Sequence, residues 1–314
     1  MLKKDKGDIH MDIITLLLKQ NLVMFAYLSI GYFLYKNKLV SKQGSADIGR
    51  ILLYVVMPVA ILKSYLAEFS IERLEGLAVS FFAALLSLIL AIITARMAFP
   101  KEQKIERFGA AFSNAGFIGI PLVEMTLGGE AVFYVSSFVA LLNILQWTYG
   151  LVTITGEHSL VSVKRLSTNP IIISFLAGIT LFLLPVSLPE TVHNVVGTIA
   201  AMNGPLAMMV LGVYLGQVPL HSLFSERVAY RCTFVRLIII PLLTIPLMLL
   251  FPEKYHLMKL TILIAASAPV GSNVAIFAQL YEQNYTQAVK EVCLSTLLCI
   301  ISLPLILGIA NYIL

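Results

Sequence analysis

Charged side chains are scarce in this sequence, since Asp, Glu, Lys and Arg together make up only 12% of its 314 residues. This is about half of their share in an ordinary soluble domain. Apolar residues make up 59%, and the mean hydropathy is +0.90. Such a composition is typical of an integral membrane protein. Because each spanning helix uses about 20 residues, ten of them leave no room for an attached ATPase, kinase or periplasmic receptor domain.

Side chains that carry chemistry are also rare. The three cysteines form no CxxC pair, and the five histidines fall in loops or at helix ends, so we expect no haem, no metal and no other cofactor. Glu124 is the one acid clearly inside a predicted span, and Glu291 lies about a turn into the last one. The absence of two deep carboxylates argues against cation exchange, and the absence of a deep cluster of reactive groups argues against an enzyme.

Apolar windows bounded by charge, proline or glycine predict an all-α protein with ten membrane-spanning helices. They lie near residues 13–35, 47–66, 75–98, 106–127, 131–154, 168–185, 191–215, 228–251, 257–280 and 287–313. Residues 1–12 form a polar tail that lacks the features of a cleaved secretory signal.

The distribution of lysine and arginine predicts the orientation. Joints after the odd-numbered spans hold thirteen of the 22 basic residues and the opposite face holds six, while Lys19, Lys63 and Arg236 fall within spans. Because basic residues favour the cytoplasmic side, we expect both termini to be extracellular and residues 155–167 to form a cytoplasmic linker in a plasma-membrane protein. The net charge of +5 therefore reports topology, and we expect no nucleic-acid partner. We expect Lys19 and Lys63 to extend toward the membrane interface.

The chain reads as two copies of one pattern, in residues 13–154 and 168–314. Each copy has a proline in its second span and another in its fourth, and the intervals between them are 63 residues (Pro58 to Pro121) and 64 residues (Pro205 to Pro269). Five spans per copy is an odd number, so the copies must be inverted relative to each other. Corresponding broken segments in inverted halves are typical of secondary transporters, although proline and glycine are common in membrane helices and the match could be coincidence.

The fourth and ninth spans carry the candidate site. In "AAFSNAGFIGIPLVEMTLG" and "AASAPVGSNVAIFAQ", glycine and proline interrupt the helix at mid-depth. Interrupted backbone at this depth must be buried in protein or line a cavity, and the half-helix N-termini it creates suit a carboxylate. The predicted substrate-binding residues are Asn114, Gly116, Gly119, Pro121, Asn143, Gln146, Pro269, Gly271, Ser272 and Asn273.

The amides in this set can donate to a carboxylate or accept from an acid, and the alternative for each, as for Asn203, is a hydrogen bond between helices. Arg236 lies deeper in its span than the other basic residues. We expect it either to balance the charge of an anionic substrate or to pair with a backbone carbonyl or an acid such as Glu291.

The motifs "SNAGFIGIPL", "APVGSNVAIFAQLY", "NPIIISFLAGI" and "GPLAMMVLGVYLG" resemble the auxin efflux carrier family, specifically its short bacterial members and more distantly the plant PIN carriers. The resemblance covers nearly the whole chain. It implies ten helices in two inverted five-helix repeats with crossed fourth and ninth helices, as in bile-acid symporters and the NhaA antiporter. It also implies a scaffold of spans 1, 2, 6 and 7, a homodimer, and an organic anion such as malate or malonate held by Asn114, Pro121, Pro269 and Asn273.

These observations predict a secondary transporter of small organic anions in which a transport subdomain moves against a scaffold, as in an elevator mechanism. We expect Gly31, Gly178, Gly212 and Gly216 to allow close helix approach at the boundary between the two subdomains. Sodium or a proton are the candidate coupling ions. One alternative is a sodium-coupled symporter of the bile-acid type, with a cation site beside Ser272, Asn273 and Gln279, and another is a membrane sensor that binds its ligand without moving it.

Overall fold

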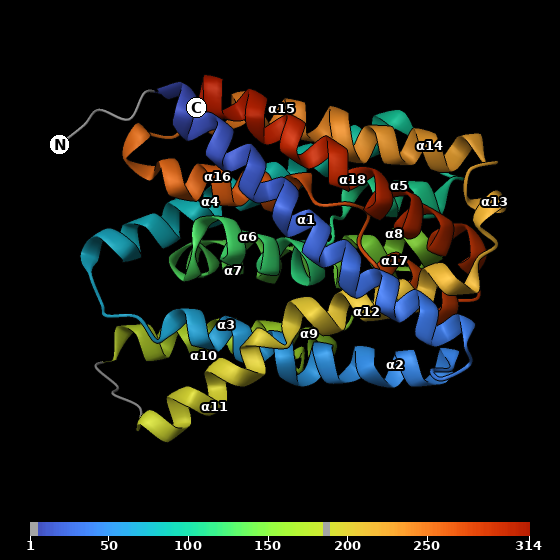
Figure 1. The fold of residues 1–314 in the computed structure, drawn as a ribbon, viewed down its shortest axis with the longest axis horizontal. Helices are drawn as coiled ribbons and strands as arrows, with labels where there is room; N and C mark the ends of the chain where they lie inside the picture. Colours follow the sequence, from blue (N-terminus) through green and yellow to red (C-terminus); the bar gives the residue numbers. More distant parts are fainter. Residues whose placement is uncertain (1–5, 185–188) are drawn as a thin grey trace.

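The computed structural model describes residues 6–184 and 189–314, and in these residues the chain is helical apart from short joints and one isolated β-bridge (Figure 1). The α-helices in chain order are α1 (Lys6–Lys36), α2 (Lys42–Ile51), α3 (Met57–Tyr65), α4 (Ile71–Ala98), α5 (Lys104–Ala111), α6 (Ile120–Leu127), α7 (Gly129–Leu145), α8 (Leu151–Thr155), α9 (Val163–Ser167), α10 (Pro170–Leu183), α11 (Glu190–Ala201), α12 (Asn203–Gln217), α13 (Leu220–Leu223), α14 (Arg227–Phe234), α15 (Ile240–Met248), α16 (His256–Ser267), α17 (Asn273–Leu280) and α18 (Tyr285–Ile313).

Several of these helices join into longer rods through a single π-helical turn. The turns η1 (Leu52–Val56), η3 (Gln146–Gly150) and η5 (Val235–Ile239) connect α2 to α3, α7 to α8 and α14 to α15, and η2 (Ala115–Gly119) precedes α6. Helical rods follow the predicted spans to within a few residues. The two rods that contain gaps, α5 to α6 and α16 to α17, are the fourth and ninth predicted spans.

Within residues 6–184 and 189–314, six helical rods are long and apolar enough to cross a membrane. They are Lys42–Tyr65, Ile71–Ala98, Gly129–Thr155, Glu190–Gln217, Arg227–Met248 and Tyr285–Ile313. Shorter apolar helices, Leu22–Lys36, Ala115–Leu127 and Pro170–Leu183, fall within three other predicted spans. The prediction of a helical membrane protein is therefore confirmed, while ten spans in two inverted repeats remain a prediction.

Capping side chains mark where several helices begin. Ser70 Oγ accepts a hydrogen bond from Arg73 N before α4, at 3.2 Å, and Asn169 Oδ1 accepts one from Ile171 N before α10, at 2.9 Å. Such caps satisfy amide groups that have no partner within the helix. Pro170 occupies the first turn of α10, where its missing N–H removes no helical hydrogen bond.

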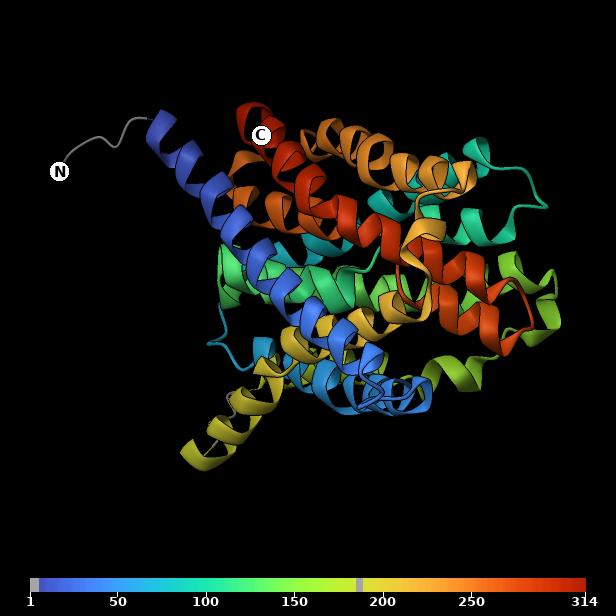
Figure 2. The ribbon, with the colours of Figure 1, turned by 45° about the vertical axis from the view of Figure 1, so that its right-hand side comes forward.

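The helices pack in two groups. One group contains α1, α2, α3, α10, α11 and α12, in which α1 packs most extensively on α12, and α3 on α10 and α11. The other contains α4 to α8 and α14 to α18, in which α7 packs on α4, α6 and α16, and α18 packs on α14 and α17. In Figures 1 and 2 the other helices of the first group form the lower layer, and α1 runs obliquely across one face from the upper layer to the lower one. The first group consists of the predicted spans 1, 2, 6 and 7.

Glycine allows the closest helix approaches within the first group. A Cβ built on Gly212 of α12 would lie 1.9 Å from Leu28 O of α1, and one built on Gly31 would lie 2.0 Å from Met209 O. A Cβ built on Gly178 or Gly216 would instead meet a side chain, that of Tyr65 at 2.5 Å or that of Tyr35 at 2.8 Å. The expected close approach is confirmed, but its place was wrong, because these contacts join helices within one group and do not lie between the two groups.

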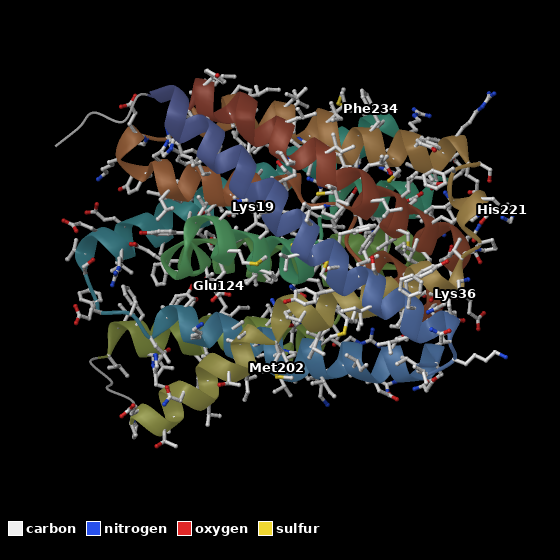
Figure 3. The ribbon with its side chains drawn as sticks, viewed as in Figure 1. Lys19, Lys36, Glu124, Met202, His221 and Phe234 are labelled. Carbon is white, nitrogen blue, oxygen red and sulfur yellow. The ribbon has the colours of Figure 1, made fainter. Side chains whose placement is uncertain are left out.

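The start of α1 and the end of α18 lie at the same end of the molecule (Figure 1). Lys36 and His221 lie at the opposite end, in two joints that the sequence assigns to the cytoplasm (Figure 3). Lys19 is exposed on α1. The extracellular placement of the termini remains a prediction.

Candidate functional site

The two interrupted rods meet at their gaps. The chain is non-helical between Ala111 and Ala115, and again between Ser267 and Asn273. Within the gaps, Ser113 and Val270 form an antiparallel β-bridge. Asn114 N donates to Pro269 O at 2.7 Å, and Gly271 N donates to Phe112 O at 2.9 Å. Each gap therefore supplies hydrogen-bond partners to the other, which makes interrupted backbone tolerable inside a membrane protein.

The two prolines do not occupy equivalent positions in these gaps. Pro269 lies inside the second gap, whereas Pro121 lies in the first turn of α6, after the helix has restarted. Proline is tolerated there because it follows the π-helical turn η2, and the carbonyl five residues back, Gly116 O, accepts from Asn203 Nδ2 of α12 instead. The similar intervals of 63 and 64 residues thus led to the correct pair of spans, but they do not mark matching positions.

The gaps contribute to a small cavity at the crossing. Seven of the ten predicted substrate-binding residues line it: Asn114, Gly116, Asn143, Gln146, Gly271, Ser272 and Asn273. Its volume is about 20 Å³. A cavity needs roughly 10–15 Å³ to hold a single water molecule. A dicarboxylate therefore requires the surrounding helices to separate.

Side-chain amides from four elements are gathered here. Asn273 Nδ2 donates to Gln146 Oε1 at 2.7 Å, which connects the second gap to η3. Asn143 Nδ2 donates to Val139 O within α7 at 2.9 Å. Asn203 Nδ2 of α12 donates to Gly116 O at 3.4 Å, which connects the two helix groups. Asn203 thus makes the bond between helices that the sequence allowed as the alternative to ligand contact, whereas Asn143 bonds within its own helix and lines the cavity.

Asn114 is only partly satisfied. Its Oδ1 accepts from Phe117 N at 3.4 Å and so caps the restarted helix. Its Nδ2 is buried and has no hydrogen-bond partner among the described residues, and the same is true of Ser113 Oγ beside it. A buried donor without a partner is unfavourable by about 1–3 kcal/mol. An anion in the cavity would supply the missing acceptor.

Arg236 lies at the C-terminal ends of α5 and α16, the two half-helices that end at the gaps. The residue is 1% exposed, and its Nη1 donates to Ala110 O at 3.0 Å and to Ala111 O at 3.3 Å, while its Nη2 donates to Ala266 O. These carbonyls end α5 and α16, where the helix dipole is negative. Arg236 therefore pairs with backbone carbonyls, the second of its two expected roles, and it does not line the small cavity.

The remaining predicted residues lie close to the cavity without lining it. Gly119 packs against Ala115 and Ala265, and Pro121 packs against Gly204. Gln279, which the sodium-coupled alternative places beside Ser272, is exposed at the end of α17 and does not line the cavity. No cluster of three metal-ligating side chains occurs in the described part of the chain.

Sequence reasoning missed several residues that line the cavity, among them Ser113, Met57 and Phe117. Ser113 directly precedes Asn114 in the interrupted motif, and this adjacency is the signal in the sequence for its position in the gap. Met57 is apolar and lies in another span, and a Cβ built on Gly116 would lie 2.3 Å from its Cε. No feature of the sequence indicates that contact.

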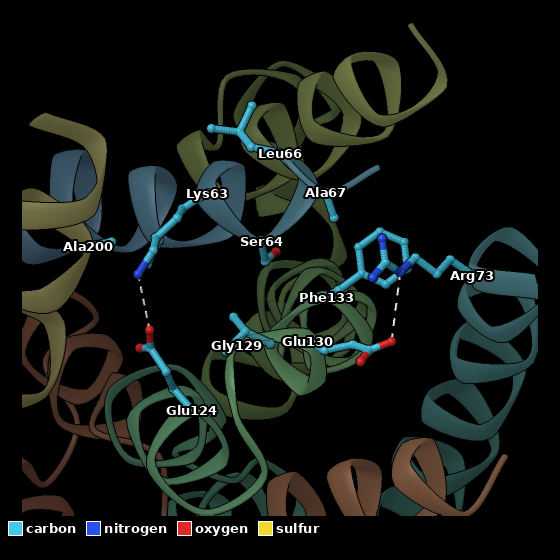
Figure 4. Close-up of a pocket in the computed structure, with 12 residues that line it drawn as sticks. Lys63, Ser64, Leu66, Ala67, Arg73, Glu124, Gly129, Glu130, Phe133 and Ala200 are labelled. Atoms are coloured by element: carbon cyan, nitrogen blue, oxygen red, sulfur yellow. Dashed lines mark hydrogen bonds and ion pairs between the residues drawn. The ribbon is translucent and has the colours of Figure 1, made fainter. Parts of the chain in front are cut away.

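A larger cavity of about 220 Å³ lies between α3 and the start of α7 (Figure 4). Two ion pairs border it: Lys63 Nζ lies 3.2 Å from Glu124 Oε1, and Arg73 Nε lies 3.7 Å from Glu130 Oε1. Lys63 therefore pairs with a carboxylate on α6, and its extension toward the membrane interface remains a prediction.

The fold and the site together define the class of protein. The described chain is a helical membrane protein with two interrupted helices that meet over a polar cavity, an arrangement typical of transporters. A family model described as "Membrane transport protein" matches residues 16–162 and 157–307. The chain therefore belongs to this membrane transport protein family, which confirms the assignment to the auxin efflux carriers.

One curated relative is the protein of Rhizobium meliloti (strain 1021) named "Putative malonate transporter". It is 24% identical over 208 residues, which are 63% of this chain and 64% of that protein. The match thus covers less than two thirds of the relative's length. Both names indicate a transporter and not an enzyme.

Proposed function

We propose that this protein is a secondary transporter of small organic anions, with mono- and dicarboxylates as its substrates. The observation that carries the proposal is the buried, unpartnered Nδ2 of Asn114, which lies beside a cavity that the two restarted helices border. Amide donors and helix N-termini are the groups that a carboxylate requires when no lysine or arginine is present. The name of the Rhizobium relative supports a dicarboxylate and makes malonate the first substrate to test.

Substrate entry requires a change of conformation, since a cavity of about 20 Å³ is too small for malonate. The grouping of the helices supports a rigid movement of the group that carries the gaps, α4 to α8 and α14 to α18, against the other group. Tyr65 Oη, on α3, lies 2.7 Å from Ser136 Oγ on α7, and Asn203 contacts Gly116 O, so such a movement exchanges a few polar contacts between the groups. The homodimer and the plasma-membrane location follow from the family resemblance.

Uptake of radiolabelled malonate into vesicles that contain only the purified protein tests the proposal. We expect uptake by the wild type, and loss of at least about tenfold in Asn114→Ala and Asn273→Ala, because each change removes an amide from the cavity. The matched control is Asn37→Ala, at an exposed asparagine in the joint before α2. Normal uptake by both cavity variants would contradict the site.

The same vesicles separate the alternatives. A strict sodium requirement for uptake would favour the sodium-coupled symporter. Binding of malonate by the purified protein, seen as a thermal shift, without any flux would favour a sensor. Uptake that is independent of sodium excludes both of these alternatives.

A further inference from the structure

A carboxyl group is buried inside the helix group that carries the gaps, apart from the candidate substrate site. Glu291 of α18 is 0% exposed. Its Oε1 accepts a hydrogen bond from Gln287 Nε2 at 3.1 Å, one helical turn away. Its Oε2 has no hydrogen-bond partner among the described residues. The transport site described above makes no use of this group.

Glu291 faces other helices on several sides. On α5, Gly109 lies so close that a Cβ built there would be 2.7 Å from Glu291 Oε2. Glu106, a turn earlier on α5, is 8% exposed, and both it and Glu226, which precedes α14, are acidic neighbours that repel a charge on Glu291. On α14, the thiol of Cys232 lies beside the carboxyl group.

The basic side chains near Glu291 bind other groups. Lys290, the preceding residue on α18, forms an ion pair with Glu226. Arg236 of η5 donates to the carbonyls of Ala110, Ala111 and Ala266. No ion pair to Glu291 is found in the described part of the chain.

A buried carboxylate without a cation is strongly unfavourable, and the two acidic neighbours add repulsion. The neutral acid removes both effects. Since Oε1 already accepts from Gln287, the geometry places the proton on Oε2, against Gly109. A proton on Oε2 would leave this buried site without an unpaired charge.

We propose that Glu291 is a proton-binding site that couples proton movement to carboxylate transport. The inference rests on the proposed function. α18, α5 and α14 belong to the helix group that carries both gaps, so a proton on Glu291 moves with the bound anion. The Glu291 carboxylate takes up a proton on one side of the membrane and becomes the neutral acid. The neutral Glu291 side chain releases that proton on the other side. One positive charge thus accompanies each anion, and no oxidant or reductant is involved.

Vesicles with an entrapped pH-sensitive dye test this inference. With the wild type, we expect malonate addition to move protons into the lumen, and an imposed pH gradient to drive malonate accumulation. With Glu291→Gln, which keeps the shape of the neutral acid, we expect both proton signals to be lost while exchange of labelled for unlabelled malonate continues. Glu157→Gln, at an exposed residue of the joint after α8, should leave all three measurements unchanged.

Each result bears on a different claim. Proton movement that persists in Glu291→Gln, or malonate flux without proton movement in the wild type, would overturn the inference and leave the proposed function intact. An absence of malonate flux in the wild type would overturn the proposed function. The infrared C=O band of a carboxylic acid, measured on purified wild type at neutral pH and compared with Glu291→Gln and Glu291→Asp, tests the bound proton without transport. A spectrum in which Glu291→Gln loses no such band would contradict the site.

Discussion

Lys63 Nζ on α3 lies 3.2 Å from Glu124 Oε1 on α6, and this ion pair joins the two helix groups beside the larger cavity (Figure 4). The side chains are 34% and 37% exposed, so solvent weakens their attraction. The two residues are 61 positions apart in the chain. Their contact exists only because the first group of helices packs against the second at this point.

Removal of the ion pair between Lys63 and Glu124 should raise the rate of transport. An exposed ion pair contributes about 0.2–1 kcal/mol, which corresponds to at most about a fivefold change in rate if the pair must separate during movement. We expect Lys63→Met and Glu124→Gln each to raise the malonate exchange rate within that limit. The double variant Lys63→Met/Glu124→Gln should match either single variant, because the second change removes nothing further. Additive effects of the two changes would show that the residues act independently.

Replacement of Asn114 by aspartate removes its donor and adds a charge. An aspartate still caps the helix through Oδ1, but it replaces the unpartnered Nδ2 donor with an acceptor, and its carboxylate is buried without a cation. We expect Asn114→Asp to lower the thermal stability and to bind malonate at least tenfold more weakly. Thermal unfolding with and without malonate measures both quantities, with Asn37→Asp as the exposed control. Unchanged malonate affinity would remove Asn114 from the site.

The sequence predicted those parts of the site in which a residue is unfavourable for a regular helix. Glycine and proline inside long apolar runs located both interrupted helices, and the amides next to them were correctly expected at one place. Contacts that depend on packing could not be predicted in this way. The pairing of Ser113 with Val270, and the three carbonyls that Arg236 binds, join residues far apart in the chain. The similar spacing of the prolines was misleading about their positions, because Pro269 lies inside a gap and Pro121 lies at the start of α6, after η2 has restarted the helix.

Gly212 should not tolerate a side chain. A Cβ there would lie 1.9 Å from the backbone oxygen of Leu28, and neither backbone can move without separating α1 from α12. We expect Gly212→Ala to lower stability by about 1–3 kcal/mol, the usual effect of overpacking. Gly49→Ala is the matched control, since nothing lies within 4 Å of a Cβ at that helical position, and alanine there should be neutral or slightly stabilising. Thermal unfolding in detergent compares the two. Equal unfolding temperatures for both variants would show that the helices separate easily.

Arg236 should stabilise the crossing of the two interrupted helices without contacting the substrate. Its guanidinium donates to carbonyls at the ends of both α5 and α16, and it lies outside the small cavity. Arg236→Met leaves these buried carbonyls without their donor, at about 1–3 kcal/mol for a lost buried partner. Arg236→Lys keeps the charge but loses the planar fork, so we expect an intermediate loss. If Arg236 acts only on the helix ends, both variants unfold at lower temperature, and malonate still raises that temperature by the same amount as in the wild type. A malonate-induced shift that disappears in Arg236→Met but remains in Arg236→Lys would instead show that the positive charge balances the substrate.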